Sequence, residues 1–467
     1  MTPGARLKAG AEVLDDIFSR HRPASVALSD WGRNNRYAGS GDRSAIGTLV
    51  FEALRRKHSI AAAFGDDSSR ALALGAALMA LGLDAAGVAK AADGSTYAID
   101  ALSEHECEAL RRLQAGMRAQ TAALADADVD GAGDGEAASG AEWSESSADV
   151  PHIAGDFPEW LTPNMVRAFG EDAALEGMAL AQRAPVDLRV NALKATQAKV
   201  LKALSRFAAE PGPFSTLAVR IPVPMPGKRT PNVEADTAHG KGWFEVQDAG
   251  SQVAALLAGV KPRDQVLDLC AGAGGKTLAM AGNMQNTGQI YAYDRDAVQL
   301  RPIFERLKRA GVRNVQVMDA GVESQLEAVA DRFDVVFVDA PCTGSGTWRR
   351  RPDAKWRLKP EGLALRQADQ QAVLRAAAKM VKPGGRLVYV TCSVFVEENE
   401  DQMTWFAAEH SDFERLPIGP IWAEAIPGIS TETAGVDPEA FSVLLTPRRH
   451  GTDGFFIAVA RKLPPQS

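Results

Sequence analysis

Two cysteines in this chain follow short apolar runs and stand beside small, turn-forming residues. Cys342 lies in the segment DAPCTGSG, after the run DVVFV, and Cys392 lies in YVTCS, after the run RLVYV. Each apolar run predicts a buried strand. The rim at the carboxyl ends of parallel strands is where α/β sheets bind ligands, and a thiol that ends such a strand lies at that rim. The pair therefore indicates chemistry on a carbon that requires a sulfur nucleophile.

A glycine-rich loop precedes both cysteines. Residues 266–277 read VLDLCAGAGGKT, a strand that runs through a loop into the start of a helix. Glycines let the backbone approach a ligand closely, and a helix N-terminus offers unpaired amides. Asp294 falls 22 residues after Gly272, where a carboxylate can accept both ribose hydroxyls of a nucleoside. The loop suits a dinucleotide or S-adenosylmethionine, with a tight structural turn as the alternative.

A Walker A phosphate loop is excluded by spacing. That motif needs a glycine five residues before Gly275, and position 270 is a cysteine. The same Cys270 follows a predicted core strand, so we expect it to line the loop without a catalytic role. Cys107 falls in a predicted helix and is expected to have no chemistry.

Strands and helices alternate from about residue 244 onward, which predicts a doubly wound, mostly parallel α/β sheet. Helices are expected between the strands, for example at 297–311 and 365–381. Six strands are predicted, at 265–271, 289–296, 315–320, 334–341, 386–393 and 454–462.

The remaining regions have other patterns. Helical spacing of apolar residues runs through the first 122 residues, with Asp42 and Ser103 as predicted N-caps. A strand at 187–193 and a following helix suggest a small α+β subdomain after residue 150. We therefore predict four parts: an all-α domain (1–122), an acidic disordered linker (123–149), an α+β subdomain (150–245) and the α/β domain (246–467).

The acidic charge of the chain is concentrated in one place. Of a net charge of −7, the stretch 126–149 contributes eight acids and no base, so the rest of the chain carries +1. The overall acidity therefore does not argue against a polyanionic partner. Six bases against one acid gather at 349–359, beginning seven residues after Cys342. A solvated face is the alternative, but this position favours contacts to phosphates, with Trp348 and Trp356 available either to stack on bases or to pack in a core.

Several classes of protein are disfavoured. The four cysteines form no C-x-x-C pair and the seven histidines do not cluster near them, so we expect no metal site and no disulfide framework. The first residues lack the apolar core of a signal peptide, and no apolar run reaches transmembrane length. We expect a cytoplasmic protein of two or three domains that does not enter a membrane.

Taken together, the motifs resemble a known family. The order of the motifs and the paired PC and TC cysteines resemble the RsmB/NOP/Sun family of S-adenosylmethionine-dependent RNA (cytosine-5) methyltransferases over about residues 150–465. The N-terminal region is similar to the NusB-like RNA-binding domain of bacterial members, best at ARLKAGAEVL and DRSAIGTLVFEALRR. The matching stretches are LRVN (188–191), DLCAGAGGKT (268–277), YDRD (293–296), MDA (318–320), DAPCTGSG (339–346), RRRPDAKW (349–356), TCS (391–393) and HGTDGFF (450–456).

The resemblance implies a fold and a set of site residues. The fold would be a Rossmann-like class I methyltransferase sheet, preceded by the small α+β subdomain and the all-α domain. Cys392 would be the nucleophile, Cys342 would assist product release, and Asp339 would act on the base. Asp294 would bind the ribose and Asp319 would lie near the adenine. The cofactor, S-adenosyl-L-methionine, would contact Cys270, Ala271, Gly272, Ala273, Gly274, Gly275, Lys276, Asp294, Asp319 and Asp339.

The implied activity is methylation of carbon 5 of a cytosine in RNA through a covalent cysteine adduct. Ribosomal RNA or a pre-ribosomal particle is the expected partner, and the protein is expected to be a monomer. Transfer RNA is the rival substrate, and an idle RNA-binding or assembly factor is the rival class. The chain departs from the family at Gly272-Ala273, where Ala-Pro is usual, and at PCTGSG, where PCSGTG is common.

Overall fold

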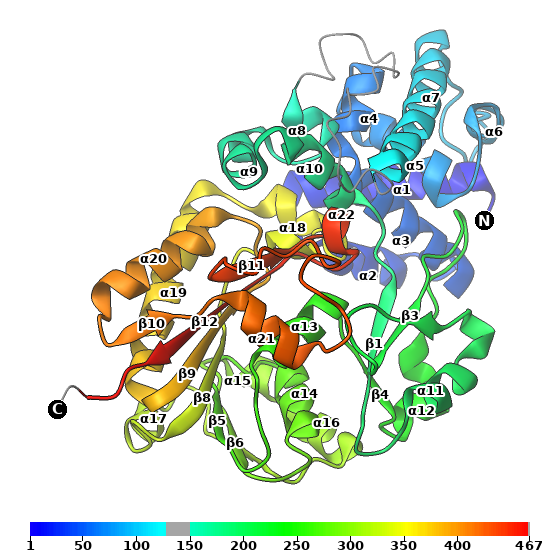
Figure 1. The fold of residues 1–467 in the computed structure, drawn as a ribbon. Coiled ribbons are helices and arrows are strands. Elements are labelled where there is room, and N and C mark those ends of the chain that lie inside the picture. The colour runs from blue at the N-terminus through cyan, green and yellow to red at the C-terminus, as the bar shows by residue number, and fades with distance from the viewer. Residues whose placement is uncertain (128–149, 466–467) are drawn as a thin grey trace. The chain divides into compact units, whose positions relative to one another are not determined.

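The computed structural model describes residues 1–127 and 150–465, which form two compact units (Figure 1). Neither unit is continuous in sequence. Unit 1 consists of Met1–Arg183, Pro224–Thr230 and Trp348–Leu358, and unit 2 of Ala184–Val223, Pro231–Thr347 and Lys359–Ser467. The predicted boundaries at residues 122 and 245 do not coincide with this division.

Unit 1 is helical, as predicted for the N-terminal region. Its core is a cluster of alanine, leucine, isoleucine and valine side chains, together with Phe64, from the first 113 residues. The helices are α1 (Pro3–Arg20), α2 (Ala24–Asn34), α3 (Ser40–Arg55), α4 (Lys57–Phe64), α5 (Ser69–Ala80), α6 (Ala85–Ala91), α7 (Glu104–Ala127), α8 (Pro151–Ala154), η1 (Glu159–Leu161), α9 (Thr162–Phe169), η2 (Gly170–Asp172), α10 (Ala173–Ala181) and α18 (Pro352–Arg357).

One of the two predicted helix caps in this region is confirmed. Ser103 precedes α7, its hydroxyl accepts a bond from the Glu106 amide, and the Glu106 carboxylate accepts from the Ser103 amide. Asp42 is not a cap, because α3 begins two residues earlier and its carboxylate instead accepts bonds from Arg6. Helix α7 continues to residue 127, beyond the predicted start of the acidic linker; the remainder of that linker, 128–149, lies outside the described residues.

Most of the basic tract belongs to unit 1, and the prediction that it contacts phosphates is wrong for its two buried bases, Arg349 and Lys355; Arg351, Arg357 and Lys359 are exposed, and for them it stays a prediction. Trp348, Arg349 and Lys355 are buried. The Lys355 ammonium donates to the backbone oxygens of Arg55 and Asp156, and the Trp356 indole donates to Leu54 O. Burial in this position lowers the pKa of Lys355 to about 7. These side chains therefore anchor the segment in the helical core.

Unit 2 contains a small antiparallel sheet in the strand order β2-β3-β1-β4. Strand β1 pairs with β3 through Leu188 and Val219, and with β4 through Val190 and Phe244, and these side chains form its core. The elements around it are β1 (Val186–Val190), α11 (Gln197–Ala203), η3 (Ser205–Phe207), β2 (Glu210–Pro211), β3 (Ala218–Ile221), η4 (Val233–Ala235), α12 (Thr237–Gly240) and β4 (Phe244–Val246).

The large sheet of unit 2 has the strand order β10-β12-β9-β8-β5-β6-β7, with β11 paired to β12. Strands β5 to β9 are parallel, and β12 runs antiparallel to β9. All six strands predicted for this sheet are present, and β10 and β11 are additional. The strands are β5 (Gln265–Asp268), β6 (Gln289–Ala292), β7 (Val315–Val317), β8 (Phe333–Asp339), β9 (Val381–Thr391), β10 (Phe413–Arg415), β11 (Ser442–Leu445) and β12 (Phe455–Lys462).

Both faces of this sheet are covered, which explains its continuous apolar strands. Successive residues point to opposite faces, so Val266 joins one hydrophobic cluster and Leu267 joins the other. The helices of the sheet domain are α13 (Ala249–Leu257), α14 (Gly275–Asn283), α15 (Ala297–Leu300), α16 (Ile303–Ala310), α17 (Glu323–Glu327), η5 (Ser345–Thr347), α19 (Pro360–Met380), η6 (Val396–Glu398), α20 (Glu400–Glu409), α21 (Ile418–Ala425) and α22 (Pro447–His450).

Some predicted helix boundaries were wrong for local reasons. The helix predicted at 297–311 is two helices, because Pro302 lacks the amide that would continue α15. The helix predicted at 365–381 begins earlier, at Pro360, a residue that suits the first helical turn. Within the described residues, no helix combines the length and apolar character needed to cross a membrane.

Candidate active site

The predicted site residues lie at the carboxyl ends of the parallel strands. The strand order reverses between β5 and β8, because β6 and β7 lie to one side of β5 and β8 and β9 to the other. Strand β5 ends at Asp268, β8 at Asp339 and β9 at Thr391, one residue before Cys392. Such a switch point leaves a crevice in which open α/β sheets bind ligands. The glycine loop, Asp339 and both cysteines are therefore gathered at one edge of the sheet.

The glycine loop has the backbone that its sequence predicts. Gly272 and Gly274 both have positive φ angles, of 49° and 81°. A Cβ on Gly274 would come 2.5 Å from Ile303 Cγ1, whereas a Cβ on Gly272 would meet open space. The Gly272 amide donates to Asp294 Oδ2 at 2.8 Å, so the structure brings the predicted ribose-binding carboxylate to the loop.

A buried carboxylate lies beneath this loop. Asp268 accepts a bond from the Thr277 hydroxyl at 2.6 Å, and its Oδ1 has no hydrogen-bond partner in the described part of the chain. Burial is the main cause that raises the pKa of Asp268 to about 7, and the carboxylate of Asp339 adds to it. Burial also raises the pKa of Cys270, which agrees with a passive role for that thiol.

Lys276 and Asp339 form an ion pair at the edge of the crevice. The Lys276 ammonium lies 2.7 Å from Asp339 Oδ2 and 5.1 Å from the centre of the Phe455 ring. Burial by itself lowers the pKa of Lys276, but the Asp339 carboxylate outweighs it and the pKa is raised. Lys276 therefore carries its proton at neutral pH.

Asp319 lies at the same edge, two residues beyond β7, and is exposed. Its carboxylate accepts a bond from the Gln325 amide at 2.7 Å. The hydrogen bonds of its side chain and amide are to Gln325, and not to the glycine loop or Asp294. The structure thus places Asp319 beside the strand ends without joining it to the other candidates.

The two cysteines meet across the ends of β8 and β9. The Sγ atoms of Cys342 and Cys392 are 3.3 Å apart, and both thiols are free. The hydrogen bond between the two thiols, followed by burial, raises the pKa of Cys342. Cys342 is therefore protonated and can donate its S–H to the Sγ of Cys392.

Hydroxyl and backbone bonds hold the two cysteine loops together. The Gly346 amide donates to Cys392 O at 2.9 Å. The hydroxyls of Ser345 and Ser393 are 3.0 Å apart, and the Val394 amide donates to Ser345 Oγ. These bonds fix the loop of one thiol against the loop of the other.

Glu398 is a supporting residue that sequence reasoning missed. Its side chain is fully buried, and its Oε1 accepts bonds from the Thr343 amide at 2.8 Å and from the Gln370 amide at 3.0 Å. Its Oε2 accepts from the Thr343 hydroxyl. Burial raises the pKa of this carboxyl. The only sequence signal was the acid-rich stretch EENED at 397–401, five residues after Cys392, which reads as a solvated helix start.

Two of the segments that resemble the family, LRVN and HGTDGFF, hold loops of the site in place without lying at its reactive groups. Arg189 in LRVN is buried, which lowers its pKa to about 10, and it donates to Gln247 Oε1 at 2.6 Å and to Gly275 O at 3.4 Å. In HGTDGFF, Gly454 packs on Gly346 so closely that a Cβ on Gly346 would lie 2.3 Å from Gly454 O. Both stretches therefore position loops of the crevice.

The doubly covered sheet, its switch point and the glycine loop with Asp294 define a Rossmann-like class I methyltransferase domain. Comparisons with known proteins identify the family. The family described as 16S rRNA methyltransferase RsmB/F matches residues 255–461, and the RsmF/B-like ferredoxin-like domain matches 157–227. The probable ribosomal RNA small subunit methyltransferase B of Synechocystis sp. is 33% identical over 314 residues, 66% of this chain and 67% of that protein. The chain belongs to the RsmB/F methyltransferase family.

Solved structures agree on the fold. The crystal structure of PH0851 is similar over 99% of both chains, with a TM-score of 0.67 at 24% identity. A methyltransferase homolog protein from Pyrococcus horikoshii is 29% identical, with a TM-score of 0.53 over 67% of this chain and 98% of that one. The match to the curated relatives spans about two thirds of their length.

Proposed function

We propose that this protein methylates carbon 5 of a cytosine in ribosomal RNA, through a covalent adduct with Cys392. The observation that carries the proposal is the contact between the Cys342 and Cys392 thiols across the ends of β8 and β9, the strands next to the switch point. The names of the related small subunit methyltransferases support ribosomal RNA as the substrate.

The cofactor that we propose is S-adenosylmethionine. The residues suit such a ligand, because the carboxylates of Asp294 and Asp339 outnumber the Lys276 ammonium around a loop that is open above Gly272, and the ligand carries a sulfonium cation. When bound, S-adenosylmethionine supplies an electrophilic methyl group. In this proposal the glycine loop and Asp294 hold the nucleoside part, and Asp319 flanks the adenine.

Carbon 5 of cytosine is too weak a nucleophile to take the methyl group unaided. The Cys392 thiolate adds to carbon 6, and the ring becomes an enamine whose carbon 5 can attack. The ion pair of Lys276 and Asp339 gives ring nitrogen 3 a proton or a strong hydrogen bond as charge develops there. After methylation, Cys342 relays the carbon 5 proton, or acts as its base, once it has passed its own proton to solvent, and the Cys392 thiolate leaves. The target base must be unpaired or flipped out of its stem.

The test is transfer of labelled methyl groups to RNA that lacks the modification. Wild type, Cys392→Ala and Cys342→Ala are compared on naked 16S ribosomal RNA, on assembled small subunits and on transfer RNA, with a denaturing gel for adducts. We expect labelled cytosine with wild type, no label with Cys392→Ala, and a trapped protein–RNA adduct with Cys342→Ala. An adduct that forms with Cys392→Ala would contradict the assignment of the nucleophile. Label on transfer RNA alone would mean that transfer RNA, and not ribosomal RNA, is the substrate.

An idle RNA-binding factor is the competing function. It would bind RNA and leave it unlabelled on all three substrates. The monomeric state and the cytoplasmic location stay predictions.

A further inference from the structure

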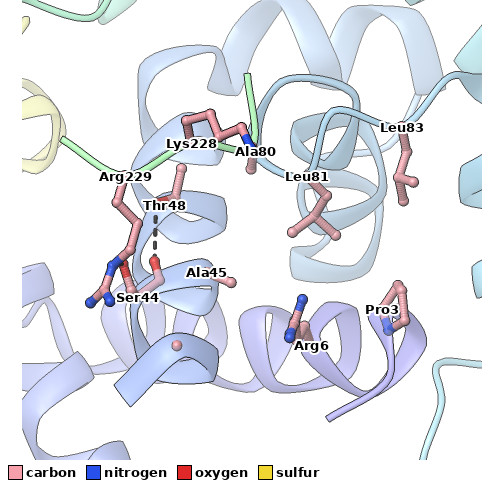
Figure 2. A pocket seen from close by; sticks show the side chains of 12 residues that line it. Pro3, Arg6, Ser44, Ala45, Thr48, Ala80, Leu81, Leu83, Lys228 and Arg229 are labelled. Carbon is pink, nitrogen blue, oxygen red and sulfur yellow. Dashed lines mark hydrogen bonds between the residues drawn. The ribbon is translucent and has the colours of Figure 1, made fainter. Parts of the chain in front are cut away.

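Unit 1 contains a cavity of about 240 Å³ that is lined by none of the proposed catalytic or cofactor-binding residues (Figure 2). Helices α1 and α3, the end of α5 and the loop 227–229 form its walls. The loop comes from a distant part of the sequence and packs here against the helices. The cavity thus depends on the tertiary structure of unit 1.

The charged side chains that line the cavity are all positive. Its residues include three bases, Arg6, Lys228 and Arg229, and no acid. Arg6 is paired with Asp42 at 2.8 Å. Lys228 and Arg229 form no ion pair in the part of the chain that the structure describes, and the Lys228 side chain is exposed beside the cavity. The cavity therefore has two positive charges without a carboxylate partner, which favours an anionic ligand.

The loop that carries these two charges is held in place at several points. Arg229 Nε donates to Ser44 Oγ at 2.7 Å, in the wall shown in Figure 2. Arg183 donates to Pro224 O at 3.5 Å and to Thr230 Oγ1 at 3.2 Å, near the two ends of the loop. Gly227 has φ 75°, and a Cβ there would lie 3.2 Å from Leu81 O. The Arg229 guanidinium and the loop that carries both cations are thus held in the folded chain, so a ligand has to order only the exposed Lys228 side chain.

The size of the cavity and the chemistry of its lining favour a phosphate group over a nucleobase as the ligand. A volume of about 240 Å³ is below the ~300–1,000 Å³ of cavities for drug-sized ligands. The lining has no aromatic ring on which a nucleobase could stack. It does have two hydroxyl groups, of Ser44 and Thr48, beside its three basic side chains. Basic and hydroxyl side chains are the usual partners of the nucleic-acid backbone.

We propose that this cavity binds a backbone phosphodiester of the RNA substrate, with Lys228 and Arg229 as its cationic contacts. The inference rests on the proposed function for the identity of the RNA. It adds a contact site on unit 1 that is separate in sequence from the cysteines and from the glycine loop. Contacts of this kind fix the position of an RNA and do not read its sequence.

The test is RNA binding by the full chain, measured by fluorescence anisotropy as a function of salt. In Lys228→Gln, the affinity should fall by up to about fivefold, as for one exposed ion pair. The slope of log affinity against log salt should fall by about 0.7, the value for one phosphate contact to a single strand. In Ala45→Leu, which adds volume to the cavity wall without changing charge, the affinity should also fall.

The matched control is Lys8→Gln. Lys8 is an exposed lysine on α1, two residues after Arg6 and so about 200° around the helix, and it does not line the cavity. We expect this variant to bind as wild type does. Circular dichroism of each variant confirms that the fold is kept.

Binding is measured apart from methyl transfer, so the two proposals can fail separately. Equal loss in Lys8→Gln and Lys228→Gln, or wild-type binding by Ala45→Leu, would show diffuse electrostatic attraction and overturn the cavity proposal. A second result would also overturn it: inorganic phosphate or adenosine monophosphate stabilises the protein against thermal unfolding, while Lys228→Gln binds RNA as wild type does. The cavity would then bind a small anion and not the RNA. Loss of labelled cytosine in wild type, with the Lys228 effect on binding intact, would overturn only the methylation.

Discussion

At the scale of single residues, the position of Cys342 depends on Glu398, a buried carboxylate seven residues beyond the end of β9. Glu398 accepts three bonds, two of them from Thr343, the neighbour of Cys342. It makes no hydrogen bond to the glycine loop in the described residues. A loss of Glu398 should therefore act on the cysteine chemistry and not on cofactor binding.

We expect Glu398→Ala to lower kcat for methyl transfer by about 100-fold, the cost of misplacing a reacting group by about 1 Å. KM for S-adenosylmethionine should stay unchanged. Stability should fall as well, because each unsatisfied buried donor costs about 1–3 kcal/mol. Steady-state kinetics and thermal melting check these expectations.

The control pair is Thr343→Ser and Thr343→Val. Serine keeps the hydroxyl that donates to Glu398 and should behave as wild type, whereas valine should give an intermediate loss of kcat. A rise in KM for the cofactor in Glu398→Ala would contradict a role confined to the cysteine loop.

Asp268 gives a prediction of pH dependence. Its pKa is raised to about 7 in the folded chain, whereas the unfolded chain loses this proton near pH 4. Between these values the folded state binds more protons than the unfolded state, so the free energy of unfolding falls as pH rises and is constant above about pH 7. The loss is at most about 4 kcal/mol.

Asp268→Asn removes this titration while keeping an acceptor for the Thr277 hydroxyl. Its melting temperature relative to wild type should therefore rise between pH 5 and pH 8. A difference between the two melting temperatures that is the same at both pH values would show that Asp268 is ionised in the folded chain throughout.

At the scale of elements, the terminal strand β12 helps to set the geometry of the cysteine loops. Gly454 lies just before it, and a Cβ there would come 2.6 Å from Gly346 Cα and 2.7 Å from Val394 Cγ1. Gly346 in turn holds Cys392 O through its amide. An added methyl group at this contact must push one cysteine loop away from the other.

We expect Gly454→Ala to lower the free energy of unfolding by about 1–3 kcal/mol, as for an overpacked core, and to reduce methyl transfer. Gly282→Ala is the matched control, since a Cβ at this position in α14 would meet nothing within 4 Å. This control should keep activity and gain up to about 1 kcal/mol from helix propensity. Denaturant unfolding and labelled-methyl transfer measure both effects, and full activity in Gly454→Ala would contradict the role of this contact.

The elements also show what sequence could predict. The strands, the glycine loop, Asp294 and the two thiols follow from local patterns, because apolar runs and glycines fix the sheet edge on which they lie. The burial of Lys355 could not be predicted, because its ammonium donates to the backbone oxygens of Arg55 and Asp156, which are far away in sequence. Glu398 was missed for the same reason: its partner Thr343 is 55 residues away.

At the scale of the whole molecule, unit 1 is completed by a segment from the middle of the sheet domain's sequence. Residues 348–358 contribute Trp356 to the helical core and tie α2 through a bond from the Ala24 amide to Asp353. A fragment that ends at residue 183 lacks these contacts and leaves part of its core uncovered.

We expect the fragment 1–183 to melt at a lower temperature than a fusion in which a flexible linker joins it to residues 348–358. The same fusion with Trp356→Ala and Lys355→Met is the control and should lose most of the gain. Circular dichroism as a function of temperature measures all three. Equal melting temperatures for fragment and fusion would mean that the helices are stable without the inserted segment.

Because the segments of the two units alternate in sequence, the order of translation determines when unit 1 can be completed. The helical unit begins at the first residue but receives its last segment only when the ribosome has reached residue 358, about 175 residues after residue 183. At about 5–20 residues per second, the nascent helices wait roughly 10–35 s for that segment. We expect chaperones to bind their uncovered apolar surface during this interval, so that the order of translation affects the yield of folded protein in addition to the final packing.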